Sequence, residues 1–236
     1  MPNRNKITPT TSLQFYPCFG HFECARLDVP LDWSPTSQSK ARAAVALARL
    51  PAKVPVTDSR YGGSILINPG GPGGSGVIAA VLFGRYAQMV VDSPNDPNTN
   101  SGGKYFDIIG FDPRGINNTT PTASCFPDDL SRELWELLRH TEGIVSNITF
   151  PYVWSRIESF SEGCSKRMSD VGDNSVGEFV NTPVVVEDMM AIVEALGEWR
   201  EKAAKEQLRA QPVSQQAAIL ERTKWRKGRE KVLYWG

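Results

Sequence analysis

The stretch that decides the fold is the glycine-rich Asn68–Gly76, NPGGPGGSG, which holds five glycines in nine residues. It follows a short apolar run, Ser64–Ile67, and precedes a longer one, Val77–Val91. So many glycines between two apolar runs indicate unusual backbone angles, or a close approach of the backbone to a neighbouring element or ligand. The pattern predicts a buried strand, a tight loop and a buried helix.

A second buried strand is predicted over Tyr105–Phe111 (YFDIIGF), where the apolar run stops at Asp112–Gly115 (DPRG). Two buried strands joined through a helix predict a parallel sheet. Upstream, Cys24–Trp33 and Ala41–Leu50 alternate apolar and polar residues on either side of a Ser/Pro/Thr-rich turn, which predicts an antiparallel hairpin. The predicted fold class is therefore α/β, with a mostly parallel sheet and an N-terminal antiparallel hairpin.

The second half of the chain is predicted to be largely helical. Amphipathic segments near Asp129–His140 and Tyr152–Met168 are interpreted as helical excursions over the sheet. A further helix is expected to begin with Thr182 as its N-cap and Pro183 in its first turn, and Gly197 interrupts its apolar pattern.

One domain is expected, because no second core or internal repeat is visible. Residues 1–14 are interpreted as a flexible N-terminal segment and residues 15–236 as a partial α/β domain. Within that domain, residues 198–230 are rich in Lys, Arg, Glu, Gln and Ala and predict a solvated, charged helical extension or insertion. Lys231–Trp235 then resumes an apolar, β-rich run.

Composition excludes some partners and leaves the location open. Lys plus Arg equals Asp plus Glu at 26 each, so no net field would attract nucleic acid. No run approaches the roughly 20 apolar residues of a transmembrane helix, and residues 1–12 lack a signal-peptide core. Yet four cysteines and three glycosylation sequons, at Asn117, Asn118 and Asn147, suit a secretory or extracellular protein.

The glycine-rich loop has three possible interpretations, of which two are functional and the third is a purely structural turn. Its backbone N–H groups could stabilise the oxyanion of an acyl-transfer transition state. Alternatively, Gly71–Gly76 satisfies the G-x-G-x-x-G dinucleotide pattern. That pattern requires an acidic residue about 20 residues further on, after the next strand, and here the next strand lies much further away. Pro72 also makes the loop stiffer than the dinucleotide pattern requires, which disfavours that interpretation.

Three motifs in series resemble a known family. Cys24–Trp33 (CARLDVPLDW), the NPGGPGGSG loop and Phe106–Gly115 (FDIIGFDPRG) resemble, in order and spacing, the N-terminal half of α/β-hydrolases related to tripeptidyl aminopeptidase and prolyl iminopeptidase. The resemblance covers nearly the whole chain from about Phe15, and the charged insertion is similar to that of fungal members. It continues through Asn181-Thr182, Asp188, Ala195–Glu198 and Tyr234–Gly236.

The resemblance implies a serine hydrolase that attacks a peptide or ester carbonyl in a small substrate. In that family the segment similar to Tyr234–Gly236 continues into a G-x-S-x-G nucleophile elbow, and the acid and histidine come later. We therefore expect this chain to stop before its nucleophile and to be inactive alone. Gly70 and Gly71 correspond to the oxyanion loop, with the Gly71 N–H as the donor. We expect no cofactor, and peptidase and esterase remain open.

The cysteines allow three pairings. Proximity in the sequence and the family pattern favour Cys18 with Cys24 and Cys125 with Cys164. The alternative is four free thiols, as expected of a cytosolic protein.

Neither histidine suggests a second site. His21 lies between Cys18 and Cys24, but a metal site there lacks a clear fourth ligand, so a packed or disulfide-closed loop is favoured and no metal is expected. His140 ends an amphipathic segment and is expected on the surface.

The remaining polar residues near the loop also have structural interpretations. Ser64 and Ser75 lie on or beside the loop, but neither sits in a G-x-S-x-G elbow. Asp112 and Arg114 follow a strand at the cleft end and could meet a substrate, although a structural turn and ion pair near the loop is favoured. The alternatives to a hydrolase are a noncatalytic binding or regulatory protein and a nucleotide-binding oxidoreductase.

Overall fold

The computed structural model describes residues 7–71, 73–94, 96–99, 101–141, 149–169, 175–209 and 212–236. Within these residues a six-stranded sheet has the order β1-β2-β3-β5-β4-β6. The strands are β1 Tyr16–Cys18, β2 Phe22–Pro30, β3 Arg42–Leu50, β4 Tyr61–Ile67, β5 Tyr105–Phe111 and β6 Leu233–Trp235. The helices are α1 Gly76–Val91, α2 Asp129–Thr141, α3 Phe150–Ser169, the 3-10 helix η3 Gly177–Phe179, α4 Thr182–Leu208 and α5 Val213–Thr223.

The sheet is mixed rather than mostly parallel, so that part of the prediction is wrong. Strand β4 pairs in parallel with β5 and β6, but β1–β2, β2–β3 and β3–β5 are antiparallel. Three of the five strand pairs in the described part of the chain are therefore antiparallel. The predicted hairpin is confirmed as β2–β3, and the predicted strand Tyr105–Phe111 is β5 with the same bounds. The prediction failed because β3 lies antiparallel against β5, which no local pattern indicates.

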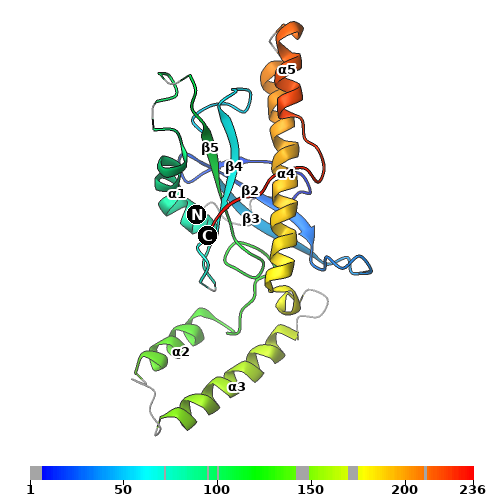
Figure 1. Ribbon diagram of the computed structural model, residues 1–236. Helices are drawn as coiled ribbons and strands as arrows, with labels where there is room; N and C mark the ends of the chain where they lie inside the picture. Colours follow the sequence, from blue (N-terminus) through cyan, green and yellow to red (C-terminus); the bar gives the residue numbers. More distant parts are fainter. Residues whose placement is uncertain are drawn as a thin grey trace.

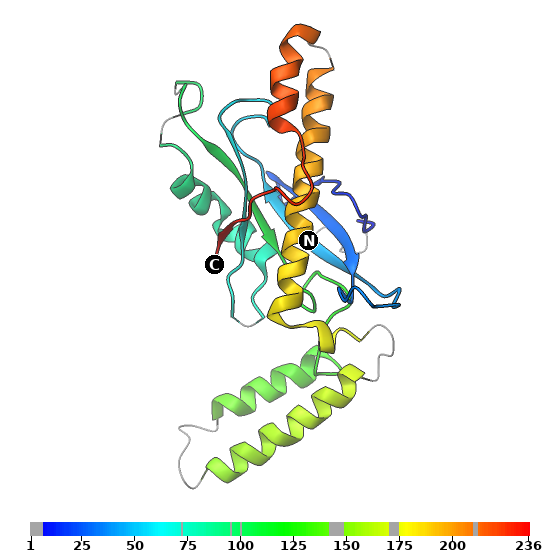
Figure 2. The ribbon, with the colours of Figure 1, turned by 45° about the vertical axis from the view of Figure 1, so that its right-hand side comes forward.

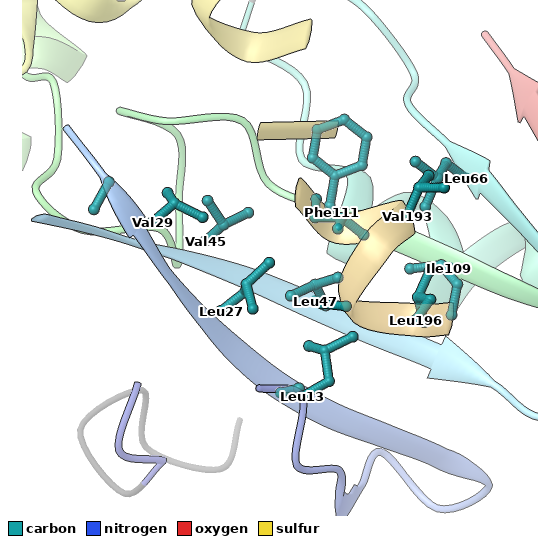
Figure 3. Packing of buried hydrophobic residues seen from close by; sticks show 14 of the residues in the cluster. Leu13, Leu27, Val29, Val45, Leu47, Leu66, Ile109, Phe111, Val193 and Leu196 are labelled. Atoms are coloured by element: carbon teal, nitrogen blue, oxygen red, sulfur yellow. The ribbon is translucent and has the colours of Figure 1, made fainter. Parts of the chain in front are cut away.

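Helices α1 and α4 cover opposite faces of the sheet (Figures 1 and 2). Figure 3 shows Val193 and Leu196 of α4 close to Leu66, Ile109 and Phe111 of the central strands, within one buried cluster. On the other face, α1 packs against a second cluster that includes Ile65 and Ile108. The result is a three-layer α/β/α arrangement, in which the sheet is buried on both faces.

The start of α1 lies unusually close to β5. A Cβ atom added to Gly76 would stand 2.1 Å from the carbonyl oxygen of Phe111, and one added to Gly110 would stand 2.0 Å from the carbonyl oxygen of Gly76. Such distances leave no room for any side chain, so both positions require glycine. Packing therefore explains Gly76, the last glycine of the loop.

The N-cap of α4 is Asn181 rather than the predicted Thr182. Asn181 has an extended backbone, and its side chain accepts a hydrogen bond from the Val184 N–H at 3.1 Å. Thr182 and Pro183 are the first helical residues, where the missing N–H of proline costs no helical hydrogen bond. The prediction was one residue late because both Asn and Thr are good N-caps and the sequence offers them side by side.

The region 198–230 extends α4 and adds a second helix, and part of it is buried instead of solvated. Helix α4 continues through Gly197 to Leu208, α5 spans Val213–Thr223, and the chain then returns along α4 to β6. Ala204 and Leu208 are fully buried, and Arg222 of α5 donates hydrogen bonds to two backbone carbonyls of the loop before β4. The charged residues of this region therefore lie on the surface of helices whose other side chains are packed against the fold.

Gly197 lies where the returning segment crosses α4. A Cβ atom there would meet Trp225 Cδ1 at 2.6 Å and Glu230 Cδ at 2.8 Å. The crossing is held by a hydrogen bond from Trp225 Nε1 to Glu194 at 2.7 Å and by the Arg200–Glu230 ion pair at 2.8 Å.

Gly197→Ala is therefore expected to destabilise the protein by about 1–3 kcal/mol, the usual cost of overpacking. This is the reverse of the gain of about 1 kcal/mol that Gly→Ala normally brings inside a helix. Gly163→Ala is the matched control, because a Cβ at this helical position in α3 meets nothing within 4 Å. Urea denaturation of both variants tests this, and equal stability of the two would contradict it.

Helices α2 and α3 form a pair that extends away from the sheet (Figures 1 and 2), so the predicted excursion over the sheet is wrong. Their predicted positions are confirmed within a few residues. The pair is held internally, because Trp135 of α2 stacks on Phe160 of α3 with ring centroids 4.5 Å apart. Both predicted disulfides, Cys18–Cys24 and Cys125–Cys164, are present.

The two ends of the described chain add to the sheet. Thr10 bridges to Leu27 of β2, and Leu13 is buried in the core, which differs from the flexible segment expected over residues 1–14. At the other end, β6 pairs with β4 and forms an edge of the sheet among the described residues. No helix in the described part of the chain has the length and apolar character to cross a bilayer.

Candidate active site

The glycine-rich loop joins β4 to α1 at the carboxyl ends of the parallel strands β4 and β5. Gly70, Gly71 and Gly73 have φ angles of +70°, +135° and +93°, which other residues rarely adopt. Gly74 is required for a different reason, because a Cβ there would stand 2.4 Å from the Gly70 carbonyl oxygen. The loop's conformation thus depends on glycine at each of these positions.

The two predicted oxyanion residues differ in what their N–H groups do. The Gly70 N–H donates to the side-chain Oδ1 of Asn68 at 3.0 Å. The Gly71 N–H makes no hydrogen bond to any residue that the structure describes. Both glycines line the same cavity. The structure therefore leaves Gly71, rather than Gly70, with a donor free for a ligand, and Asn68 is a loop residue that the sequence did not single out.

Asp112 fixes the end of the loop and the start of α1 by hydrogen bonds. Its buried carboxylate accepts hydrogen bonds from the Ser75 hydroxyl at 2.6 Å, from the Val77 N–H at 3.0 Å, and from both the backbone and the side chain of Asn118 at 3.1 Å. Ser75 is the N-cap of α1 and accepts from the Ile78 N–H. Asp112 and Ser75 are thus structural here, and for Asp112 this agrees with the favoured interpretation of a structural turn.

Arg114 forms a buried ion pair, but its partner is Asp188 of α4 rather than the expected Asp112. Arg114 Nε and Nη2 bind the two carboxylate oxygens at 2.7 and 2.6 Å, and the side chains are 0% and 1% exposed. Trp33 Nε1 also donates to Asp188 at 2.9 Å. A carbonyl of Pro30 accepts from Arg114 at 3.0 Å. This buried network fixes α4 against the end of β2 and the segment after β5.

A cavity of about 720 Å³ lies between the loop and the start of α4. Its α4 wall consists of Thr182, Val185, Val186 and Met189, whose spacing places them on one helical face. The sequence analysis predicted this helix but did not connect its apolar residues with a site. The remaining described lining residues are Asn68, Gly70, Gly71, Gly73, Gly74, Pro113, Arg114, Ile116, Ala123, Val180, Asn181 and Tyr234.

Ser64 belongs to a different cluster, away from this cavity. Its hydroxyl donates to Asp107 at 3.2 Å, beside Tyr61, whose hydroxyl donates to the same carboxylate at 2.7 Å. Burial and the Asp107 carboxylate raise the pKa of Tyr61 above its ordinary value. Arg49 binds the other Asp107 oxygen at 2.9 Å. No described histidine side chain bonds to Ser64, so nothing here would activate it as a nucleophile.

The other predicted positions lie apart from the cavity or outside the described atoms. His21 is exposed in the β1–β2 turn, His140 is near the end of α2 with its side chain outside the described part, and Asn147 lies outside the described residues. Asn117 and Asn118 donate their side-chain amides to Ser75 at 3.0 Å and Asp112 at 3.1 Å. Among the described residues, no group of three or more His, Cys, Asp or Glu could hold a metal ion.

Known proteins of similar sequence point to one kind of chemistry. The chain is 32% identical over 179 residues to the serine protease Hip1 of Mycobacterium tuberculosis, which covers 74% of this chain and 29% of that protein. Carboxylesterase B of M. tuberculosis is 34% identical over 105 residues, 44% of this chain and 17% of the esterase. The tripeptidyl aminopeptidase of Streptomyces lividans is 26% identical over 178 residues, 75% of this chain and 29% of the peptidase.

The chain spans less than a third of the length of these relatives. No family model matches it. The relatives are a protease, an esterase and an aminopeptidase, so the similarity supports a serine hydrolase-like protein of the α/β-hydrolase kind. The mixed six-stranded sheet covered by helices is consistent with part of that fold.

Proposed function

We propose that this chain forms the oxyanion-binding part of a serine hydrolase that acts on peptide or ester bonds. The observation that carries the proposal is that Gly71 lines the cavity and its N–H has no hydrogen-bond acceptor among the described residues, while the neighbouring Gly70 N–H is already bound. Acyl transfer requires donors that are already in place where negative charge develops. The Asp112 network supports this requirement by holding the loop to β5 and α1.

In such a site the carbonyl oxygen of the substrate would take its developing charge next to the Gly71 N–H as serine attacks the carbonyl carbon. The 236 residues contain no G-x-S-x-G sequence. The nucleophile, the acid and the histidine base would then come from residues outside this sequence. We therefore expect the 236-residue chain to be inactive by itself.

The dinucleotide interpretation of the same loop is disfavoured by the start of α1. A bound pyrophosphate needs the free N–H groups of a helix N-terminus. Here Val77 donates to the Asp112 carboxylate at 3.0 Å, and Ile78 donates to the Ser75 hydroxyl at 3.1 Å. A phosphate at this position would displace these bonds and meet the negative charge of Asp112.

Labelling with a fluorophosphonate probe tests the proposed function, because the probe reacts with activated serines. The gene would be expressed in its native host with an N-terminal tag, and the recombinant 236-residue chain would be tested in parallel. We expect the tagged product, or a chain that copurifies with it, to be labelled and the recombinant chain to remain unlabelled. Absence of label from both would favour the noncatalytic binding protein. A labelled 236-residue chain would overturn the expected inactivity.

A further inference from the structure

The cavity beside the loop has one apolar wall. Val185, Val186 and Met189 of α4 line it, and Ile116 and Ala123 lie among the lining residues that follow β5. Gly71 lines the same cavity. A substrate whose carbonyl oxygen binds at Gly71 would therefore have α4 within reach of the side chain next to that carbonyl.

The described lining residues offer no free charge to a substrate. Arg114 is the one described lining residue that is charged at neutral pH, and Asp188 binds its guanidinium through two hydrogen bonds. The Arg114 side chain is 0% exposed, so it cannot pair with a substrate carboxylate. A charged substrate group would thus lose its water without gaining a partner, which is unfavourable. An apolar group gains from the same burial.

We propose that this wall of α4 is the subsite for the side chain next to the scissile carbonyl, that it selects uncharged apolar groups, and that Met189 is a specificity-determining residue. The proposal rests on the proposed function for the identity of the carbonyl site. The cavity volume of about 720 Å³ lies within the range of small-molecule sites, roughly 300–1,000 Å³, and admits branched and aromatic side chains.

Binding to the 236-residue chain tests the subsite without any turnover. Methionine methyl groups would be labelled with ¹³C, and N-acetyl-L-leucinamide and N-acetyl-L-lysinamide would be titrated as probes. Met190 is an internal reference, because it is the next residue on α4 and does not line the cavity. We expect leucinamide to shift the Met189 resonance with an affinity at least tenfold above that of lysinamide, and to leave Met190 unchanged. Equal affinity for both probes, or no shift of Met189, would overturn the proposal.

Charge substitution supplies a second test. Met189→Glu is expected to reverse the preference in favour of lysinamide, because it adds the missing countercharge, whereas Met190→Glu should keep the preference for leucinamide. Val186→Glu repeats the test at an exposed position of the same wall, where folding is not at risk. An unchanged preference in the folded variants would contradict the subsite. Fluorophosphonate labelling tests the proposed serine-hydrolase function separately. Failure of that function can therefore be distinguished from failure of the subsite.

Discussion

Replacing Asp188 with alanine is expected to lower the free energy of unfolding by about 3–5 kcal/mol, the typical cost of removing one partner of a buried ion pair. The Arg114 guanidinium would lose two of its hydrogen bonds and remain buried with an uncompensated charge. Trp33 would lose its acceptor as well. Because these bonds join α4 to the end of β2 and to the segment after β5, the cavity should lose its shape along with the stability.

The measurement is urea denaturation of the purified chain, with the Arg42–Asp28 pair as the control. This pair is much more exposed, at 43% and 25% of the two side chains, so Asp28→Ala should cost less than about 1 kcal/mol. The double variant Arg114→Met with Asp188→Leu should recover much of the lost stability, since apolar replacement of a buried pair is often neutral. If Asp188→Ala and Asp28→Ala lower the free energy of unfolding equally, the buried ion pair does not stabilise the fold more than the exposed one, and the prediction is wrong.

Gly76→Ala should have the second large effect, a loss of about 3 kcal/mol, at the upper end of the usual range for overpacking. The added methyl group would stand 2.1 Å from a backbone oxygen of β5, and backbone cannot rotate away as a side chain can. The start of α1 would have to move, taking with it the Ser75 N-cap and the hydrogen bond from Val77 to Asp112.

Gly84→Ala is the matched control in the same helix. A Cβ there meets its nearest neighbours at 3.7 Å, an ordinary van der Waals distance. This variant should gain up to about 1 kcal/mol from the better helix propensity of alanine. Thermal or urea unfolding distinguishes the two, and a stabilising Gly76→Ala would refute the close approach of α1 to β5.

The sequence predicted those features that depend on neighbouring residues. The uninterrupted apolar run Tyr105–Phe111 has the bounds of β5, and the loop with its flanking strand and helix follows from the clustered glycines. The disulfide pairs were also predicted, with help from the family resemblance. The strand and the loop could be predicted because their patterns lie within a few neighbouring residues, and the disulfides because four cysteines allow only three pairings.

Features that depend on distant contacts were missed. Gly197 interrupts the apolar pattern of α4 in the sequence. In the structure it leaves space for the side chain of Trp225, which lies 28 residues further along the chain. Asp188 was noticed through resemblance alone, because nothing in its own segment indicates Arg114 as a partner. The Gly70 N–H is hydrogen-bonded only because the Asn68 side chain adopts the rotamer that reaches it, and no sequence pattern specifies that rotamer.

The central claim, that the Gly71 N–H is an oxyanion donor, is tested most directly by turnover of an aminoacyl ester by the tagged gene product carrying Gly71→Ala. A Cβ at Gly71 would stand 3.0 Å from the Gly74 nitrogen at a φ of +135°, so the peptide must rotate and carry its N–H away. Gly20→Ala is the control, since Gly20 also has a positive φ, +77°, but a Cβ there meets nothing within 4 Å.

The predicted result is a fall in kcat of roughly 10²- to 10³-fold for Gly71→Ala, as is typical when one oxyanion donor is removed, with KM little changed and Gly20→Ala close to the unmodified enzyme. A kcat for Gly71→Ala equal to that of Gly20→Ala would contradict the assignment.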